Sequence, residues 1–504
     1  MLREKLKAYI DANVPIIYVN SYDDNAVEES ILKASGRRKV WEWNQMYGLL
    51  NRKEIEKREI RSIQEILDDN CTLDEFLKKG VKEQEFQEKV IIIKNIDYYL
   101  EDARIVGLFK NACLKIEEGE LDTVFIFISS ILKVPKELEK YITVLEEEYL
   151  SEEEIRSEIL EFIEENNVGG VYEGTIDKLA LAFKGLSMLE IQTILALEFS
   201  RSGKVSEDAV EFVMEQKKQM IQKAGILEMI PVKESMEDIG GLENLKQWIQ
   251  NKAVILKNIK RAEAFGVELP KGVLIAGVPG CGKSLNAKAS AKLLDIPLLK
   301  LDMGRLMGKY VGESESNMRQ AIALAEAISP CVLWVDELEK AFAGINGSSG
   351  GAAEVTTRLF GQFLTWMQEK KSAVFVVATA NDIMKLPPEL LRKGRFDEVF
   401  YVQLPNKKER KKIFEIHIKK RRPTDVDKIQ LDKLVNMTSG YSGADIEGVV
   451  KEGIEQAFIS GKNSVSTDDF VKAIEATSSL KEIMGESLEK LESEYKKRKF
   501  KSAS

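Results

Sequence analysis

With 504 residues, the chain is too long to fold around one hydrophobic core, and we expect about three or four compact units. Its 44% hydrophobic and 31% charged residues are typical of a globular protein. The formal net charge of −9 disfavours a dedicated nucleic-acid binder, because clustered lysines and arginines dominate phosphate binding. The four cysteines form no CxxC pair and have no companion histidines, so we expect neither a disulfide framework nor a metal site built from them.

The sequence has no pattern of a membrane span or of an export signal. Its first residues, MLREKLKAYIDANVP, alternate charged and apolar positions and lack the apolar core of a signal peptide. No apolar run approaches the roughly 18 residues that a membrane-spanning helix needs. We therefore expect a cytoplasmic protein without a membrane span.

The first part of the chain predicts an αβ domain over residues 1–175. The segment NVPIIYVNSYDDNAVEESIL is typical of a strand, a turn and a helix. VIIIKNIDYYL predicts a short buried strand that is followed by a single acid, Asp97, and TVFIFISSILKVPKELEKYI predicts another strand. Helices are expected over residues 176–215, and a linker over residues 216–236.

A phosphate-binding motif follows in PKGVLIAGVPGCGKSLNAKASAKLL, which matches GxxxxGK(S/T) between an apolar strand and a helix. Glycines let successive backbone N–H groups point at phosphate oxygens, and the helix N-terminus adds its positive dipole end. Lys283 is expected to reach the β- and γ-phosphates of ATP, and the Ser284 hydroxyl to bind Mg²⁺. The residues expected to hold the nucleotide in this loop are Gly277, Pro279, Gly280, Cys281, Gly282, Lys283, Ser284 and Leu285. The structural alternative is a glycine-rich turn between a strand and a helix.

Two further strands end in polar residues that suit ATP hydrolysis. CVLWVDELEKAF places Asp336 at the carboxyl end of a buried parallel strand, where it can hold magnesium. Glu337 is then positioned to polarise the attacking water. SAVFVVATAND ends in Asn381, which can orient the same water.

An arginine pair, Arg392 and Arg395, follows in LPPELLRKGRFDEVFYV. Most arginines at such a position form surface salt bridges. In this context we favour a pair of arginine fingers for the γ-phosphate. Because a neighbouring subunit usually supplies that role, the pair predicts a head-to-tail ring.

The motifs GVPGCGKS, VDELE, ATAND, LLRKGRFD and TSGYSGADIEGVV, in this order, resemble those of the AAA ATPases, the group of the NSF-type fusion factor, the microtubule-severing enzymes and the membrane-bound AAA proteases. The resemblance runs from Asp238 to about Thr477. Within this group the chain most resembles the AAA family encoded as an open reading frame in algal plastids and cyanobacteria, with bacterial relatives.

The resemblance implies further site residues. Ile239 and Gly240 should line the adenine pocket, His417 should lie near the adenosine, and a helical lid should close over the base through Gly443 and Ala444.

The chain departs from the family pattern at two places. The family commonly has Asp-Gly where this chain has Gln368 and Glu369, which bears on coupling between subunits. Cys281 stands where threonine is common. A thiol at a helix N-terminus near a lysine is expected to have a lowered pKa, so alkylation of Cys281 should block ATP binding.

The segment MGKYVGESESNMRQA contains an aromatic–aliphatic–glycine step, Tyr310, Val311 and Gly312. In ring ATPases of this group, such a step projects into the central pore and grips an unfolded polypeptide through sequence-independent apolar contact. The alternative is that Tyr310 packs under its own helix.

The first half of the chain repeats the order of the second half without its chemistry. NVPIIYVN corresponds to PKGVLIAG but lacks the glycines and the lysine, and VIIIKNIDYYL corresponds to CVLWVDELE with Tyr98 in the place of Glu337. TVFIFISS corresponds to VFVVATAND with Ser129 in the place of Asn381, and LALAFKGLSMLEIQTIL corresponds to LVNMTSGYSGADIEGVV. These matches predict an internal duplication. The alternative is an unrelated αβ domain.

We therefore expect an α/β protein with two tandem P-loop-type modules, each with a small helical lid, of which only the second is active. The expected divisions are a degenerate αβ domain and its lid (1–175, 176–215), a linker (216–236), the ATPase core and its lid (237–403, 404–478) and a C-terminal helix with a frayed basic tail (479–504).

The expected function is Mg²⁺-dependent ATP hydrolysis by a homo-oligomeric, hexameric ring that remodels or translocates a protein substrate through its pore. One alternative is an ATP-dependent assembly switch that docks partners on the inactive module. A second is a nucleic-acid-associated motor, which the acidic charge balance disfavours.

Overall fold

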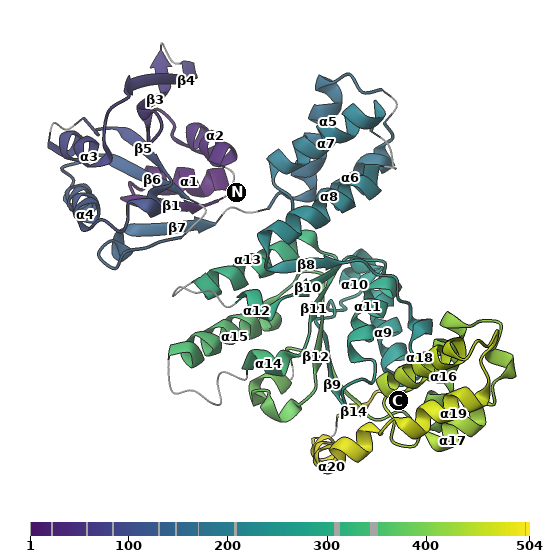
Figure 1. Cartoon of the computed structure of the whole chain (residues 1–504). Helices are drawn as coiled ribbons and strands as arrows, with labels where there is room; N and C mark the ends of the chain where they lie inside the picture. The colour runs from purple at the N-terminus through teal and green to yellow at the C-terminus, as the bar shows by residue number, and fades with distance from the viewer. Residues whose placement is uncertain are drawn as a thin grey trace. The chain divides into compact units, whose positions relative to one another are not determined.

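The computed structural model describes residues 2–21, 24–56, 59–82, 85–129, 132–146, 149–169, 171–205, 209–306, 313–342, 351–392, 394–498 and 500–504. The chain divides into two compact units, whose elements are labelled in Figure 1. The first unit comprises residues 1–169 and 186–204, and the second comprises residues 170–185 and 205–504.

The first unit contains a seven-stranded sheet with the order β4-β3-β2-β5-β6-β1-β7. Strands β2, β5, β6, β1 and β7 pair in parallel, and β3 and β4 extend the sheet as antiparallel strands. The strands are β1 (Ile16–Asn20), β2 (Lys39–Asn44), β3 (Gly48–Glu56), β4 (Glu59–Asp68), β5 (Lys89–Lys94), β6 (Thr123–Ser129) and β7 (Ile142–Glu146).

Helices cover both faces of this first sheet. On one face, α1 (Leu2–Asp11) and α2 (Asp24–Ala34) pack on residues such as Ile17 of β1. On the other face, α3 (Leu73–Lys82) and α4 (Ala103–Glu117) pack on residues such as Tyr18. Strands buried on both faces are continuous apolar runs rather than alternating ones, and this explains the composition of β1, β5 and β6. Helices α5 (Glu152–Glu165) and α7 (Met188–Ser202) also belong to this unit.

The second unit contains another seven-stranded sheet, with the order β14-β13-β9-β12-β11-β10-β8. All neighbours pair in parallel except β8, which is antiparallel to β10. The strands are β8 (Leu227–Ile230), β9 (Gly272–Gly277), β10 (Leu298–Leu301), β11 (Cys331–Val335), β12 (Val374–Ala380), β13 (Glu398–Val402) and β14 (Lys501–Ser502).

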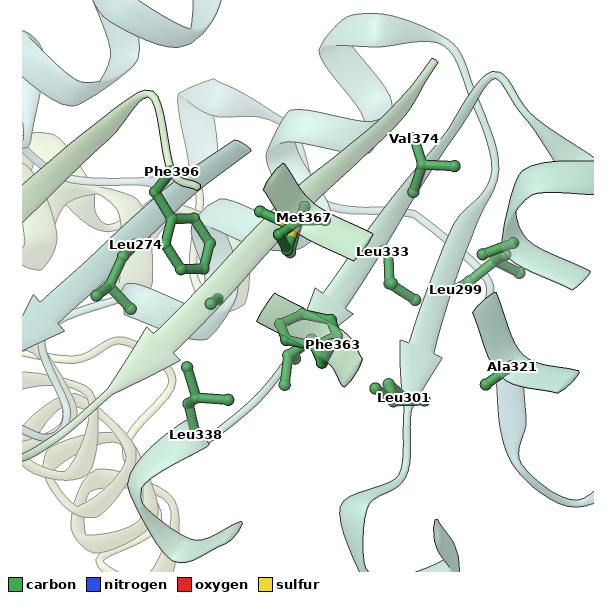
Figure 2. Close-up of a cluster of buried hydrophobic side chains, with 14 of the residues drawn as sticks. Leu274, Leu299, Leu301, Ala321, Leu333, Leu338, Phe363, Met367, Val374 and Phe396 are labelled. Atoms are coloured by element: carbon green, nitrogen blue, oxygen red, sulfur yellow. The ribbon is translucent and has the colours of Figure 1, made fainter. Parts of the chain in front are cut away.

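Two hydrophobic layers enclose this second sheet. On one face, Phe363 and Met367 of α15 (Gly351–Glu369) lie with Leu274, Leu333 and Val374 of the strands (Figure 2). Helix α13 (Glu313–Ile328) packs on the same face, and α9 (Glu243–Leu256) and α11 (Lys283–Leu294) pack on the opposite one. The unit also contains α6 (Glu173–Phe183), α8 (Ala209–Ala224), α10 (Ile259–Ala264), α12 (Met303–Leu306) and α14 (Leu338–Phe342).

A helical subdomain follows the second sheet. Helices α16 (Lys407–Arg421), α17 (Leu431–Met437), α18 (Gly443–Ile459) and α19 (Thr467–Ala476) share one core that includes Phe414, Val449 and Phe470. Helix α20 (Leu480–Lys497) continues the chain beyond this core.

The two sheets repeat one strand order. In the first unit the parallel strands run β7-β1-β6-β5-β2, and in the second they run β13-β9-β12-β11-β10. The sequence segments expected to correspond form β1 and β9, β5 and β11, and β6 and β12, so each pair has the same place in its sheet. The predicted α/β class with two tandem modules is confirmed.

Several strands were not predicted from the sequence, namely β2, β3, β4, β7, β8, β10, β13 and β14. Residues 216–236, expected as a linker, contain the end of α8 and the whole of β8. The C-terminal tail was expected to be frayed, and this was wrong. Its strand β14 pairs with β13, Ala503 is buried, and the N–H of Ala503 donates to the carbonyl of Tyr401 at 2.9 Å.

Candidate active site

The loop between β9 and α11 has a backbone that requires glycine. Gly277, Gly280 and Gly282 have φ angles of 140°, 73° and 84°. A Cβ on Gly277 would come within 2.1 Å of the carbonyl oxygen of Val402, so the loop also passes too close to β13 for a side chain. The loop leads directly into the N-terminus of α11, and because the first N–H groups of a helix have no partner within the helix, they can bind an anion.

Lys283, the first residue of α11, lies beneath this loop. Its side chain is buried, and Nζ donates to the carbonyl oxygens of Gly277 at 2.9 Å and Val278 at 2.8 Å. Burial lowers its pKa to about 8, although the carboxylates of Glu339, Asp336 and Glu337 act in the opposite direction. The amine therefore faces both the loop and the acids that follow β11.

A chain of hydrogen bonds connects α11 to the ends of β11 and β12. The Ser284 hydroxyl donates to Asp336 Oδ1 at 3.1 Å. The Thr379 hydroxyl donates to the same oxygen at 2.5 Å and accepts from the N–H of Glu337 at 3.0 Å. Thr379 was missed from the sequence, although it precedes Asn381 by two residues in ATAND. Through these two hydrogen bonds, Thr379 holds the backbone N–H of Glu337 and the carboxylate of Asp336 in place.

Glu337 has a strained backbone and two side-chain partners. Its φ of 49° lies in the left-handed region, which is costly for a residue with a Cβ. Its Oε2 pairs with Lys340 at 2.6 Å, and its Oε1 accepts from Asn381 Nδ2 at 3.3 Å. The predicted residues Asp336, Glu337 and Asn381 thus meet at the carboxyl ends of adjacent strands.

The helical subdomain contacts the phosphate-binding loop. The N–H of Ala444, in the first turn of α18, donates to the carbonyl oxygen of Gly280 at 2.9 Å. Gly443 approaches so closely that a Cβ would lie 3.0 Å from the same oxygen. The predicted lid residues therefore lie against the loop.

Cys281 is enclosed by this contact. The expected lowering of its pKa was wrong, because burial raises the pKa of the thiol to about 11. The N–H of Gly443 and the charge of Lys283 act in the opposite direction but do not outweigh burial.

The segment with Ile239 and Gly240 packs against α16. Ile239 is buried, and a Cβ on Gly240 would meet Ile413 at 2.5 Å. The buried Glu409 accepts from the N–H of Leu242 at 3.2 Å and holds this segment in place. Glu409 was not identified from the sequence.

His417 lies one helical turn beyond Ile413 on α16. Burial lowers its pKa, while the charge of Glu447 acts in the opposite direction. Its Nδ1 lies 3.3 Å from a nitrogen of Arg421, which pairs with Glu447 at 2.7 Å. The histidine is thus half-buried on the same helix that supports the segment around Gly240.

The arginine pair lies beyond β12. Arg392 is exposed, and the guanidinium of Arg395 donates to the carbonyl oxygen of Glu389. Lys271 Nζ donates to the carbonyl oxygen of Gly394, at 2.9 Å, and to that of Gln368. It thereby ties the arginine segment to the end of α15, where the chain departs from the family pattern. The predicted pore residues Tyr310, Val311 and Gly312 lie outside the described residues.

The equivalent position of the first unit carries different chemistry. Asp97 is buried and accepts from the Ser129 hydroxyl at 2.5 Å, and Tyr98 is 76% exposed. After Asn20, the last residue of β1, the sequence continues as SYDDNAVEES, which contains neither the glycines nor the lysine of the phosphate-binding motif.

Four segments match known protein families. Residues 273–404 match the family described as ATPase family associated with various cellular activities (AAA), and residues 425–472 match the AAA+ lid domain. Residues 2–147 match the N-terminal domain of SpoVK-like AAA ATPases, and residues 153–224 match the second domain of that group.

The chain is similar over most of its length to curated proteins of algae. It is 37% identical over 465 residues to "Uncharacterized AAA domain-containing protein ycf46" of Guillardia theta, which covers 92% of this chain and 88% of the relative. For the protein of the same name from Pyropia yezoensis, the identity is 35%, with 94% and 93% covered. The ATP-dependent zinc metalloprotease FtsH of Parabacteroides distasonis is 34% identical over 248 residues, 48% of this chain and 36% of that protein. Within the described parts of the chain, every helix is too short or too polar to span a membrane.

Proposed function

This chain belongs to the AAA ATPases, and within them to the family of ycf46 AAA domain-containing proteins, and we propose that it is a ring-forming motor that remodels protein substrates. As an AAA ATPase, it binds and hydrolyses ATP. The site residues, the ring and the substrate class are parts of the proposal.

We assign the triphosphate to the glycine-rich loop and to Lys283, and the adenosine to Ile239, Gly240, His417 and the lid residues Gly443 and Ala444. Pro279, Cys281 and Leu285 shape the loop. The contact between Gly280 and Ala444 supports this assignment, because it lets bound nucleotide alter how the lid meets the core. When ATP binds, Lys283 would exchange its hydrogen bonds to the carbonyl oxygens of Gly277 and Val278 for hydrogen bonds to phosphate oxygens, which are stronger acceptors.

Magnesium fits the oxygen atoms of Ser284 and Asp336. Mg²⁺ prefers oxygen ligands and usually completes its shell with substrate phosphates and water rather than with further side chains. The hydroxyl and the carboxylate already lie within hydrogen-bond distance of each other, at 3.1 Å. The ion would supply positive charge next to the phosphates.

The observation that carries the hydrolytic role is the hydrogen-bond chain from Ser284 through Asp336 and Thr379 to Glu337. In the proposal, Glu337 takes the proton of the attacking water and Asn381 orients that water. Lys340, which pairs with Glu337, is exposed and can release the carboxylate at little cost.

The proposal that the chain forms a ring depends on the two arginines, Arg392 and Arg395. We propose that Arg392 and Arg395 contact the γ-phosphate bound by a neighbouring copy, in a hexamer closed by head-to-tail contacts. Arg392 is exposed, as a residue offered to a neighbour must be. Lys271 donates to the carbonyl oxygens of both Gly394 and Gln368, and so connects the segment of the two arginines to the end of α15.

The remodelling activity is assigned to Tyr310, Val311 and Gly312 as a loop that grips polypeptide in the pore. In this proposal residues 404–478 form the lid of the active module, and residues 1–215 form an inactive module with its own lid. The second candidate function is an ATP-dependent switch that docks partners on the inactive module. Two features of the first unit favour it: the sheet of this unit is intact, and its Asp97 is hydrogen-bonded to Ser129.

The test is capture of substrate by a chain that binds ATP and cannot hydrolyse it. Glu337→Gln and Glu337→Gln/Tyr310→Ala are used as baits with and without nuclease. Polypeptides recovered only with Tyr310 intact would support remodelling. If both baits recover the same polypeptides, the result would favour the switch. If nuclease abolishes the recovery, the result would favour the nucleic-acid-associated motor.

A further inference from the structure

A third acid, Glu339, lies beside the proposed catalytic pair and has no role in the mechanism described above. Its side chain is buried. Its Oε1 accepts from Asn381 Nδ2 at 3.1 Å. Its Oε2 is buried without a hydrogen-bond partner among the described residues. Burying a carboxylate with so few partners is costly, so stability alone does not account for its presence.

Asn381 connects Glu339 to Glu337. The same amide nitrogen lies 3.3 Å from Glu337 Oε1 and 3.1 Å from Glu339 Oε1. Because the nitrogen carries two hydrogens, it can donate one to each carboxylate. A flipped amide would point its oxygen at two carboxylate oxygens, which repel it. The two acids together therefore allow only one orientation of the amide.

The two acids differ in how firmly they are held. Glu337 stands at the surface end of the pair and binds the exposed Lys340 through its other oxygen. Glu339 is on the inner side, in the first turn of α14, and is fixed by packing. A more exposed carboxylate and a buried one thus share a single amide, and the buried one, which has less room to move, determines where the amide points.

We propose that Glu339 is a positioning residue that holds the amide of Asn381 in the orientation needed to align Glu337 and its water. The inference rests on the proposed roles of Glu337 and Asn381. Without Glu339, the amide is free to rotate, and its N–H no longer faces Glu337 in every molecule. Misplacement of a reacting group by about 1 Å costs up to roughly 100-fold in rate.

The test compares steady-state kinetics of Glu339→Leu and Glu339→Gln with the wild type. Glu339→Leu should lower kcat by roughly 10-fold or more and leave the KM for ATP within about twofold, because no contact to the nucleotide is removed. Glu339→Gln keeps an oxygen that can accept from Asn381, so it should recover most of the lost kcat. Glu326→Leu is the matched control. It removes another carboxylate with side-chain hydrogen bonds, to Trp366 and Ser372, elsewhere in the same unit.

A double-mutant cycle separates positioning from damage to the fold. Since Glu339 acts through Asn381, adding Glu339→Leu to Asn381→Ala should cause no further loss of kcat. A kcat for Glu339→Leu equal to that of the wild type, or an additive loss in the double variant, would overturn the inference. So would an equal loss from Glu326→Leu.

Glu337→Gln is measured in parallel to keep the two proposals apart. If it retains turnover, the proposed function of Glu337 fails, and the inference falls with it. If it is inactive while Glu339→Leu turns over normally, only the inference about Glu339 is wrong.

Discussion

The thiol of Cys281 is enclosed between the lid and the phosphate-binding loop. With its pKa raised to about 11, its thiolate fraction near pH 7.5 is roughly 100-fold below that of an ordinary thiol. We expect iodoacetamide to label Cys281 at least that much more slowly in the folded chain than in the unfolded chain, as measured by mass spectrometry after timed pulses. Equal labelling rates in the two states would contradict the buried, neutral thiol.

Lys217 of α8 is a buried amine that makes stability depend on pH. Its Nζ donates to the carbonyl oxygen of Ala182 at 3.0 Å, and burial lowers its pKa from 10.5 to about 8, with Cys331 acting to raise it and Lys184 to lower it further. Below pH 8 the folded state therefore carries a penalty of about 3 kcal/mol. Between pH 8 and 10.5 the unfolded chain binds more protons, so this penalty disappears as the pH rises.

Denaturant unfolding at pH 7.5 and 9.5 tests this linkage. The unfolding free energy of the wild type should gain about 2 kcal/mol relative to that of Lys217→Met between these two pH values. Methionine fills the volume of the lysine stem and does not titrate. Parallel pH curves for the two proteins would contradict the assignment.

At the scale of single residues, the sequence predicted candidate site residues that belong to a short local motif. Lys283 and Ser284 were predicted from the glycine-rich loop and the start of the helix that follows it, and Asp336 and Glu337 from the end of an apolar strand, so the local chain determines the place of each. Residues whose role depends on distant segments were missed. The pKa of Cys281 depends on its burial in the folded chain, and Glu339 acquires its partner only when β11 and β12 lie side by side.

Helix α20 and strand β14 extend the second unit beyond its lid. Tyr495 of α20 is buried and stacks on Tyr401 of β13, with ring centroids 3.7 Å apart. Beyond it, Ala503 accepts from the N–H of Leu245 at the start of α9, at 3.2 Å. These contacts bind the C-terminal segment to the edge of the sheet.

Tyr495→Ala should lower the unfolding free energy of the second unit by about 3–5 kcal/mol, the usual cost of truncating a buried aromatic side chain. Chemical denaturation measures it, and Lys497→Ala, at an exposed position of the same helix, is the matched control. An unchanged midpoint for Tyr495→Ala would show that the segment is dispensable.

At the scale of elements, the apolar central strands of each sheet were predictable, and the strands nearer the sheet edges were not. β1, β5, β6, β9, β11 and β12 are buried on both faces and therefore read as apolar runs. β8, with the sequence LEMI, and β14, with the sequence KS, become strands only because an existing sheet edge offers hydrogen-bond partners. No local pattern marks them.

The whole chain should bind one nucleotide, because the phosphate-binding motif GxxxxGK(S/T) occurs once in the sequence, in the second unit. Calorimetric titration of Glu337→Gln with ATP is expected to give one site per chain, and Lys283→Met is expected to give none. Binding that survives in Lys283→Met would place a nucleotide in the first unit.

The proposed ring can be tested by mixing two inactive chains. Lys283→Met keeps its arginines but cannot bind ATP, whereas Arg392→Ala/Arg395→Ala binds ATP but lacks the fingers. If fingers act between copies, an equal mixture regains about a quarter of wild-type turnover, the share of random neighbours in the productive order. A mixture as inactive as its components would contradict action between copies.

The repeated strand order has a consequence for how the chain folds. Adjacent units of one topology offer each other alternative strand partners, and exchange between neighbouring domains is a characteristic way in which multidomain proteins misassemble. Here the equivalent strands are not interchangeable. Gly272 opens β9 where a Cβ would come within 2.1 Å of the carbonyl oxygen of Val376, whereas β1 opens with Ile16. A strand that opens with a side chain at the position of Gly272 would clash with Val376, so β1 does not fit the place of β9 in the second sheet.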